Sequence, residues 1–418
     1  MRKFQELQVI FDMDGRREAV GTVAIGEGRT YFEYEAAWQR RGIELAPFKL
    51  PVGQNTFQFE TGSLVNGLPG LCADSLPDGW GMLIMDRFFQ GRGVRHSEIT
   101  PLDRLAYLGD SAMGALCYHP ADGSGDRAVE AVDIGHAARE AHQLHEGRIE
   151  QAGRLLAKIG GSPGGARPKA LIGISDCGTR FVSGADSLPD GYSHWLVKFT
   201  PPRASGDRPF GADEGVLEYL YLQTARDAGL AVPEFRLITD EAGLRHIAVR
   251  RFDRPDGHRR LHMATAFGLL HASYQMPSLD YDQLLTVAWS LTRDIGQVRE
   301  QFRRAVFNLL AVNRDDHAKN HGYLMDETGA WRLSPAYDLT YSEGPGGEHW
   351  TAYQGEGRNP SVEQLRGLAA AASIDGADCR DDIGRVRAAL ERLPQEFKNW
   401  KIPRKHAKRI LGRLQEVV

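Results

Sequence analysis

Cysteines are few in this sequence, and they lie far apart. The 418 residues include only Cys72, Cys117, Cys177 and Cys379, and no two of these have the short spacing of a metal-binding or redox pair. A disulfide framework and a cysteine-based zinc knuckle are therefore not expected. With 42% hydrophobic residues, the chain has enough apolar material for a core without such cross-links.

Long apolar runs and a marked charge of one sign are also missing. No stretch approaches the roughly 18 consecutive apolar residues that read as a membrane-spanning helix. Residues 1–6 are followed by no apolar segment of the kind found in a secretory signal. The formal net charge of −4 gives no overall sign of nucleic-acid binding. We therefore expect a cytoplasmic protein that does not associate with membranes.

The pattern along the chain changes from β-rich to α-rich. Residues 1–125 have the pattern of strands and turns, and within them residues 74–89 predict a turn followed by a structural helix. Residues 126–250 begin with a polar helical connector and continue with strands and one helix, whereas residues 251–418 are mostly helical. The length predicts about two to three domains. The pattern favours an α+β fold whose two lobes meet near residues 249–253.

A glycine-rich segment occupies residues 160–169. Four of the six residues 160–165 are Gly, and the apolar, strand-like residues 170–172 follow the segment. Because glycine has no Cβ, the backbone N–H groups of such a loop can approach an anion closely. A glycine-rich loop that leads into a strand is typical of the phosphate-covering loop of a kinase. The Gly-Lys-Ser/Thr ending of a Walker loop is absent, and the alternative is a flexible surface turn.

Lys198 lies near the end of the apolar, strand-like residues 194–199. Period-two alternation places it on the face opposite Trp195 and Val197. A charged group in such a strand costs desolvation free energy unless an anion uses its charge, and a nucleotide phosphate would do so. The alternative is an edge-strand lysine whose ammonium group reaches water.

A helix is expected over residues 214–229, ended by Gly229. Kinases pair the strand lysine with a glutamate of the following helix. Glu218 is our candidate for an ion pair with Lys198, and Glu214 is also available.

Residues 313–321, Asn-Arg-Asp-Asp-His-Ala-Lys-Asn-His, carry the strongest signal. Asp315 and Asn320 are five residues apart. That is the separation between the base Asp and the metal-binding Asn in the kinase catalytic loop H-R-D-x-x-x-x-N. Asn313 and Arg314 stand where that motif has His-Arg. The segment follows a helix whose apolar face is formed by Val298, Phe302, Ala305, Val306, Leu309 and Leu310.

Asp338 follows the strand-like residues 331–333 and comes 23 residues after Asp315. In a kinase this is the position of the magnesium-binding Asp of the D-F-G motif. Leu339 and Thr340 replace the Phe and Gly of that motif.

These residue types suit phosphoryl transfer. Mg²⁺ prefers hard oxygen ligands, so the Asp338 carboxylate, the Asn320 amide oxygen and ATP phosphates form a suitable set. The Asp315 carboxylate can accept the proton of a substrate hydroxyl. A competing interpretation is a metal-dependent nuclease or hydrolase, which would leave the glycine-rich segment and Lys198 without a role. That enzyme would use Asp315, Asp316, His317 and Asp338.

Over nearly its whole length the sequence resembles the HipA family of bacterial toxin kinases. Residues 74–87 and 105–116 resemble the family's N-terminal subdomain. The segments that resemble its kinase core are residues 164–169, the strand with Lys198, and residues 251–254, 313–320 and 337–339. The resemblance implies a bilobal protein-kinase-like fold of the PI3/4-kinase type. Its parts would be a β-rich N-terminal subdomain (1–125), the rest of the N-lobe (126–250) and a helical C-lobe (251–418).

The resemblance also implies roles for individual residues. Asp315 would be the catalytic base, Asn320 and Asp338 would hold Mg²⁺, and residues 249–252 would form the hinge beside adenine. Ser162 matches the family's autophosphorylated serine, with Ser175 and Ser183 as nearby rival acceptors. The residues expected to contact ATP are Gly164, Gly165, Ala166, Lys169, Lys198, Arg250 and Phe252.

The function implied is that of an ATP- and Mg²⁺-dependent serine/threonine protein kinase that acts as a toxin. Its target would be a translation protein such as an aminoacyl-tRNA synthetase. Its partner would be a small helix-turn-helix, HipB-like antitoxin that binds operator DNA. The alternative is a weakly active or inactive kinase-like component that acts with the antitoxin as a corepressor.

Two positions depart from the family pattern. Residues 263–266 are Met-Ala-Thr-Ala where family members usually carry an acidic pair, and Arg250 stands where an acidic hinge residue is common. These changes bear on adenine contacts and lobe packing. The retained Lys198, Asp315, Asn320 and Asp338 favour the enzyme over the corepressor.

Overall fold

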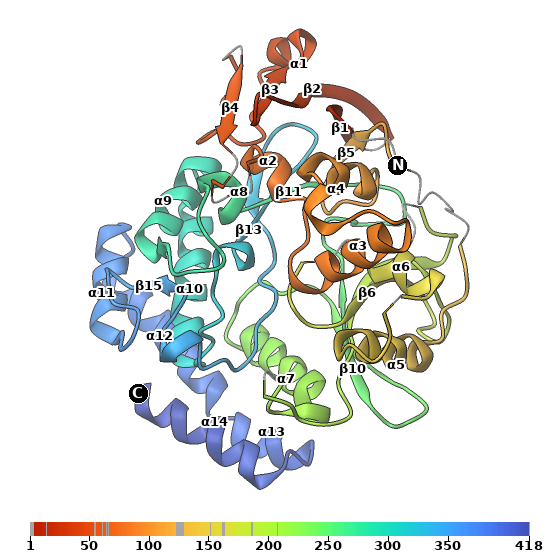
Figure 1. The fold of residues 1–418 in the computed structure, drawn as a ribbon. Coiled ribbons are helices and arrows are strands. Elements are labelled where there is room, and N and C mark those ends of the chain that lie inside the picture. Colours follow the sequence, from red (N-terminus) through yellow and green to blue (C-terminus); the bar gives the residue numbers. More distant parts are fainter. Residues whose placement is uncertain are drawn as a thin grey trace.

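The computed structural model describes residues 4–13, 15–53, 56–60, 62–63, 65, 67–122, 129–150, 152–160, 164–184, 187–206 and 208–417. Within these residues the chain has a mixed α/β fold (Figure 1). Ser162, the expected autophosphorylation site, lies outside the described residues. Among the helices described, none is long and apolar enough to cross a bilayer.

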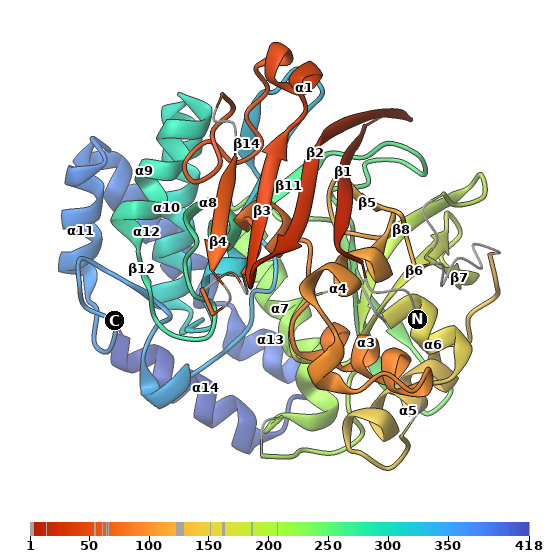
Figure 2. The same cartoon turned by 45° about the horizontal axis from the view of Figure 1, so that its top comes forward.

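An antiparallel sheet with the strand order β4-β3-β2-β1-β5 forms the N-terminal part of the protein. Figure 2 shows β1 to β4 running side by side. Alternate residues of β1, Leu7, Val9 and Phe11, are buried in the main apolar core. The strands are β1 (Glu6–Met13), β2 (Arg16–Gly26), β3 (Arg29–Tyr34), β4 (Phe57–Glu60) and β5 (Leu116–His119). The associated helices are α1 (Ala36–Arg41), α2 (Gly70–Ala73), α3 (Gly79–Gly91) and α4 (Pro101–Leu108).

A second sheet, with the order β7-β6-β8-β10-β9, carries the glycine-rich segment and Lys198. One of its faces packs against α3, α5 and α6 in a separate apolar core. Residues 129–150 were expected to form a polar connector. They also contribute to this core, because α5 buries Ile134, Ala138 and Ala141 in it. The elements are α5 (Ile134–His145), α6 (Arg154–Gly160), β6 (Lys169–Ser175), β7 (Phe181–Ser183), β8 (Tyr192–Lys198), α7 (Glu214–Asp227), β9 (Phe235–Thr239) and β10 (Arg245–Arg250).

The chain after residue 251 is mostly helical, as the sequence predicts. Helices α11 to α14 lie at the left and lower edge of Figure 1. A small sheet with the order β11-β13-β14 and the parallel pair β12 and β15 complete this part. The elements are β11 (His262–Thr265), α8 (Ala266–Leu270), β12 (Leu279–Asp280), α9 (Tyr281–Thr292), α10 (Ile295–Leu310), β13 (Gly322–Met325), β14 (Trp331–Leu333), β15 (Thr351–Ala352), α11 (Val362–Ala371), α12 (Gly376–Leu390), α13 (Leu393–Asn399) and α14 (Arg404–Val417).

The expected helix over residues 214–229 is confirmed as α7. It ends at Asp227, and Gly229 follows with a φ of 88°, the left-handed conformation that glycine adopts readily. The apolar face predicted before residue 313 is also confirmed, because all six of its residues are buried in α10.

Candidate active site

Helix α10 ends at the segment that holds Asp315. Val312 adopts a φ of 52°, which turns the chain out of the helix. Asn313 then returns to α10, because its backbone N–H donates to the Asn308 carbonyl oxygen (2.9 Å) and its Nδ2 donates to Asn308 Oδ1 (2.8 Å). The residues before Asp315 are therefore held by hydrogen bonds to the helix that precedes them.

Asp316 is a buried anchor of this loop. Its carboxylate accepts hydrogen bonds from Tyr281 Oη (3.0 Å) and from the backbone N–H of Trp350 (2.9 Å), and it lies 2.9 Å from His349 Nδ1. Burial would raise the pKa of Asp316, but His349 outweighs it and lowers that pKa below its usual value. Because these partners occupy the carboxylate, the structure disfavours the hydrolase interpretation, which needs Asp316 as a metal ligand.

Asp315 points elsewhere and lines a cleft with His317 and Asp338. Burial raises the pKa of the Asp315 carboxyl; the neighbouring His317 opposes this shift, and the negative charge of Asp338 adds to it. A carboxylate with a raised pKa is a better proton acceptor than an ordinary surface Asp.

Lys198 joins two acidic residues from distant parts of the chain. Its Nζ lies 2.5 Å from Glu218 Oε1 and 2.5 Å from Asp338 Oδ1. The lysine and Glu218 side chains are almost fully buried, whereas the Asp338 side chain is 29% exposed. Glu214 is bound instead by Arg208, so Glu218 is the helix residue that pairs with Lys198.

Asp338 occupies an unusual backbone conformation. Its φ of 56° is uncommon for a residue with a Cβ, and such conformations cluster at functional sites. Burial would raise the pKa of Asp338, but the ammonium groups of Lys198 and Lys169 outweigh it and hold that pKa far below its usual range. Asp338 is therefore ionised at neutral pH and presents an anionic oxygen to the cleft.

The glycine-rich turn and Lys169 form another wall of the cleft. Gly164, Gly165 and Lys169 line it, and Lys169 Nζ donates to the Gly164 carbonyl oxygen at 2.5 Å. Gly165 has a φ of 92°, and a Cβ there would lie 2.2 Å from Lys169 Nζ. Glycine at this position therefore makes room for the lysine. Ala166 lines the neighbouring part of the cleft together with Asp315.

Asn320 lies in the same cleft as Asp338. Its Nδ2 donates to the backbone carbonyl of Asp315 at 2.7 Å. With the amide nitrogen engaged in this way, Oδ1 is the atom that Asn320 can present to a cation. The assignment of the two amide atoms follows from this hydrogen bond.

The remaining wall of the cleft is apolar and includes the expected hinge. Leu196, Val249, Met263 and Phe252 line it, and the Phe252 ring lies 5.5 Å from the ring of Tyr337. Arg250 also lines the cleft, but its guanidinium group binds Glu234 at 3.0 Å. Arg250 thus has a partner for its charge within its own sheet.

The sequence interpretation missed the part that the N-terminal segment plays in this cleft. Residues 74–89 were expected to form a turn followed by a structural helix, and α3 confirms the helix. The residues before that helix also line the cleft beside Gly165, among them Asp74, Leu76 and Asp78. Asp78 Oδ1 accepts a hydrogen bond from the Gly165 backbone N–H, and Lys319 Nζ donates to the Leu76 carbonyl oxygen at 2.9 Å. The Pro77-Asp78-Gly79 turn was the available signal, since it marks a helix start but not what that start faces.

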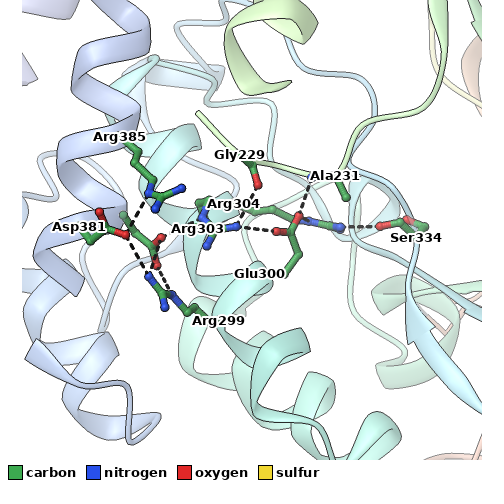
Figure 3. Close-up of polar contacts among 10 residues, drawn as sticks. Gly229, Ala231, Arg299, Glu300, Arg303, Arg304, Ser334, Asp381 and Arg385 are labelled. Atoms are coloured by element: carbon green, nitrogen blue, oxygen red, sulfur yellow. Dashed lines mark hydrogen bonds and ion pairs between the residues drawn. The ribbon is translucent and has the colours of Figure 1, made fainter. Parts of the chain in front are cut away.

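A cluster of charged residues on α10 holds this helix, which precedes the loop with Asp315, in position (Figure 3). Arg303 donates to the Gly229 carbonyl oxygen, and Arg304 donates to that of Ser334, four residues before Asp338. Arg299 and Arg303 also bind Asp382 of α12, whose side chain is completely buried. Helix α10 is thereby tied both to α12 and to the segment that leads to Asp338.

Comparisons with known proteins were made with this geometry in hand. The family model of the HipA N-terminal domain matches residues 12–119, and that of the HipA-like C-terminal domain matches residues 161–414. A Sinorhizobium fredii protein named "Putative kinase Y4dM" is 26% identical over 344 residues, which are 77% of this chain and 74% of that protein. A Haemophilus influenzae protein named "Putative kinase" is 23% identical over 159 residues, 35% of this chain and 44% of that protein.

A solved structure shares the fold. It is a chain from the Shewanella oneidensis MR-1 toxin–antitoxin system complex of HipA, HipB and operator DNA. It has a TM-score of 0.68 at 17% sequence identity, and the match covers 98% of this chain and 95% of that one.

Proposed function

This chain belongs to the HipA family, and we propose that it is an ATP- and Mg²⁺-dependent kinase that phosphorylates serine or threonine hydroxyls of a protein. The observation that carries the proposal is that Lys198 and Asp338 form an ion pair in one cleft with Asp315, while the buried Glu218 also binds Lys198. Phosphoryl transfer depends mostly on positioning and on charge stabilisation, and this set supplies both.

We assign the cleft to ATP, between an N-lobe that contains residues 126–250 and a C-lobe over residues 251–418, with residues 1–125 as an additional subdomain. The apolar wall with Leu196 and Phe252 suits a flat base. Lys169 and Lys198 suit its phosphates, because both ammonium groups lie at the cleft beside the glycine-rich turn. Residues 249–252 would be the hinge, as the sequence predicts.

The donor set fits a magnesium ion. The ionised Asp338 carboxylate and the Asn320 amide oxygen are hard ligands, and both residues line the cleft. These two residues would hold the ion, which would neutralise phosphate charge when bound.

Asp315 is the proposed base. An acceptor hydroxyl placed beside Asp315 would give up its proton to the carboxylate while its oxygen forms a bond to the γ-phosphorus of ATP and the bond to the β-phosphate oxygen breaks. The raised pKa of Asp315 supports this role. Lys198, held by Glu218, would orient the phosphates for the transfer.

The test is phosphate transfer by the purified protein. The Asp315→Asn variant should lose transfer of the labelled γ-phosphate by about a thousandfold or more, while nucleotide affinity stays within about threefold of the wild type. Retained nucleotide binding is the control for an intact fold. Transfer by Asp315→Asn at the wild-type rate would contradict the assignment.

We further propose a toxin role with a helix-turn-helix, HipB-like antitoxin as partner. The support is family membership and the fold shared with a protein of a toxin–antitoxin system. The substrate would be a translation protein such as an aminoacyl-tRNA synthetase, and Ser162 remains a predicted autophosphorylation site. Phosphoproteomics after induction of the wild type and of Asp315→Ala would identify the target. Growth arrest by both proteins, with no new phosphosite, would favour the corepressor alternative.

A further inference from the structure

A second cavity lies apart from the nucleotide cleft. It is bounded by the end of α10, residues 346–347, the start of α11 and the last turns of α14. No residue that lines it also lines the nucleotide cleft. Arg314, Arg358 and Arg413 line it together with a single acidic residue, Glu416.

Arg314 is the buried charge of this cavity. Only 8% of the residue is exposed, and its Nη1 donates to the Gly347 carbonyl oxygen. Within the part of the chain that the structure describes, its Nε has no hydrogen-bond partner. Burial lowers the pKa of Arg314, and the nearby positive charge of Arg413 adds to this effect. The carboxylates of Asp316 and Glu343 oppose these effects without outweighing them, but they pair with His349 and Arg409. Among the described residues Arg314 is therefore a buried cation that no carboxylate contacts.

The other two arginines already have acidic partners at the rim. Arg413 contacts Glu416, and Arg358 lies 2.6 Å from Glu348. Three arginines therefore face the cavity against one lining carboxylate, Glu416, which already contacts Arg413. An arginine buried without an anion costs free energy, and an anion placed between Arg314 and Arg413 would relieve that cost.

We propose that this cavity is a binding site for a phosphate group, either inorganic phosphate or a phosphomonoester, with Arg314 and Arg413 as its main ligands. The planar guanidinium fork matches the oxygens of phosphate, and paired arginines are the usual means of recognising it. The N-terminal end of α11, where Ser361 lines the cavity, adds partial positive charge.

The site is joined directly to the catalytic loop. Arg314 is the neighbour of Asp315, and its backbone N–H donates to the Ser342 carbonyl oxygen at 3.1 Å. Ser342 in turn donates its backbone N–H to the Val312 carbonyl oxygen at 3.0 Å. A phosphate group bound at Arg314 would therefore hold residues 342–347 against the loop that carries Asp315. This consequence rests on the proposed kinase function, whereas binding itself does not.

Binding can be measured on the full chain without any assay of activity. Thermal unfolding and calorimetry with inorganic phosphate, at constant ionic strength against chloride, should show stabilisation by phosphate. Arg413→Gln should weaken phosphate binding by about tenfold or more, the scale of one lost charge-assisted hydrogen bond. Arg366→Gln is the matched control, because Arg366 lies on α11 outside the cavity and pairs with Glu363 on the surface.

Two further measurements decide where the phosphate binds and whether the natural ligand is free phosphate or a phosphorylated side chain. Lys169→Met removes a phosphate-binding charge from the nucleotide cleft, so phosphate binding that is unchanged in Lys169→Met but lost in Arg413→Gln supports the proposal. Binding lost only with Lys169→Met, or no binding at all, would overturn it. If Arg413→Gln does not fold, Arg358→Gln, which removes the third arginine that lines the cavity, takes its place with a smaller expected loss of about threefold. O-phosphoserine that binds more tightly than inorganic phosphate would identify a phosphorylated side chain as the source; the reverse order would identify free phosphate.

Discussion

Single residues of the cleft are paired with partners that come from distant parts of the sequence. Lys198 and Asp338 are 140 residues apart, and Lys198 and Glu218 are 20 apart. The ammonium group is almost fully buried, which is tolerable only because two carboxylates surround it. Glu214, on the same helix, serves a different cation, Arg208.

Substitution of the two helix glutamates should separate these roles. In Glu218→Gln, Lys198 keeps only Asp338 and shifts towards it, so phosphate transfer should fall by about a hundredfold, the scale of a misplaced catalytic group. Glu214→Gln is the control because it also removes a buried charge from α7. It should lower stability but leave transfer per folded molecule within about threefold. Equal losses of transfer in the two variants would contradict the pairing argument.

Lys169 should make nucleotide binding depend on pH. Burial lowers its pKa to about 8; Asp338 opposes that shift and Lys198 adds to it. The charged form binds phosphates and predominates below pH 8, so affinity should fall as pH rises, by about tenfold between pH 7 and pH 9. Fluorescent nucleotide titrations without Mg²⁺ would measure this. The slope should disappear in Lys169→Met, and an unchanged slope there would assign the pH dependence to another group.

At the scale of elements, α10 positions the loop with the proposed base Asp315, because this helix is anchored along its length. Its arginines reach α12, the turn after α7 and the segment before Asp338. Asp382 is the common acceptor on α12 and is fully buried, whereas its neighbour Asp381 is about half exposed. Both contact Arg299, so they differ mainly in burial.

This difference predicts unequal effects of the same substitution. Asp382→Asn leaves two arginines without their buried counter-charge and should lower the free energy of unfolding by about 3 kcal/mol or more. Asp381→Asn removes a solvent-screened partner and should cost less than about 1 kcal/mol. Urea unfolding followed by circular dichroism would compare the two. Similar midpoints for both variants would mean that Asp382 does not anchor α10.

At the scale of the whole molecule, the N-terminal part completes the cleft that we assign to ATP. The start of α3 meets the glycine-rich turn, because the Trp80 backbone N–H donates to the Gly165 carbonyl oxygen (3.0 Å) and Trp80 Nε1 donates to that of Lys169 (2.8 Å). Asp74 accepts hydrogen bonds from Thr265, in the stretch 263–266 that departs from the family pattern. The N-terminal part therefore contacts both walls of the cleft.

Gly79 packs closely against the glycine-rich turn. Its φ is 34°, and a Cβ there would lie 2.5 Å from Ala166 Cα, so Gly79→Ala should push the glycine-rich turn away from α3. Nucleotide affinity should fall by about tenfold or more, since the turn lines the cleft. Gly91→Ala, at the other end of α3, meets no atom within 4 Å and is the control. It should leave affinity unchanged; an equal loss would show that any alanine in α3 disturbs the cleft.

The sequence by itself determined the local features of this protein. The order and spacing of Lys198, Asp315, Asn320 and Asp338 could be recognised in the sequence, because both depend only on position along the chain. The apolar face of α10 and the extent of α7 could be predicted, because the periodicity of apolar side chains follows helix geometry. These features were enough to predict a kinase-type cleft and to propose its residues.

Only the tertiary structure decided which of these residues meet, and what else lies with them. The sequence favoured Glu218 over Glu214 and Asp315 over Asp316, but it could not show what each side chain contacts. Packing placed Glu218 against Lys198 and Asp315 at the cleft, and it bound Glu214 to Arg208 and Asp316 to His349. It also brought Asp78 to Gly165, 87 residues away. Such contacts depend on how the sheets and helices pack against one another. A local sequence pattern does not predict this packing, because periodicity specifies which face of an element is buried but not which surface covers it.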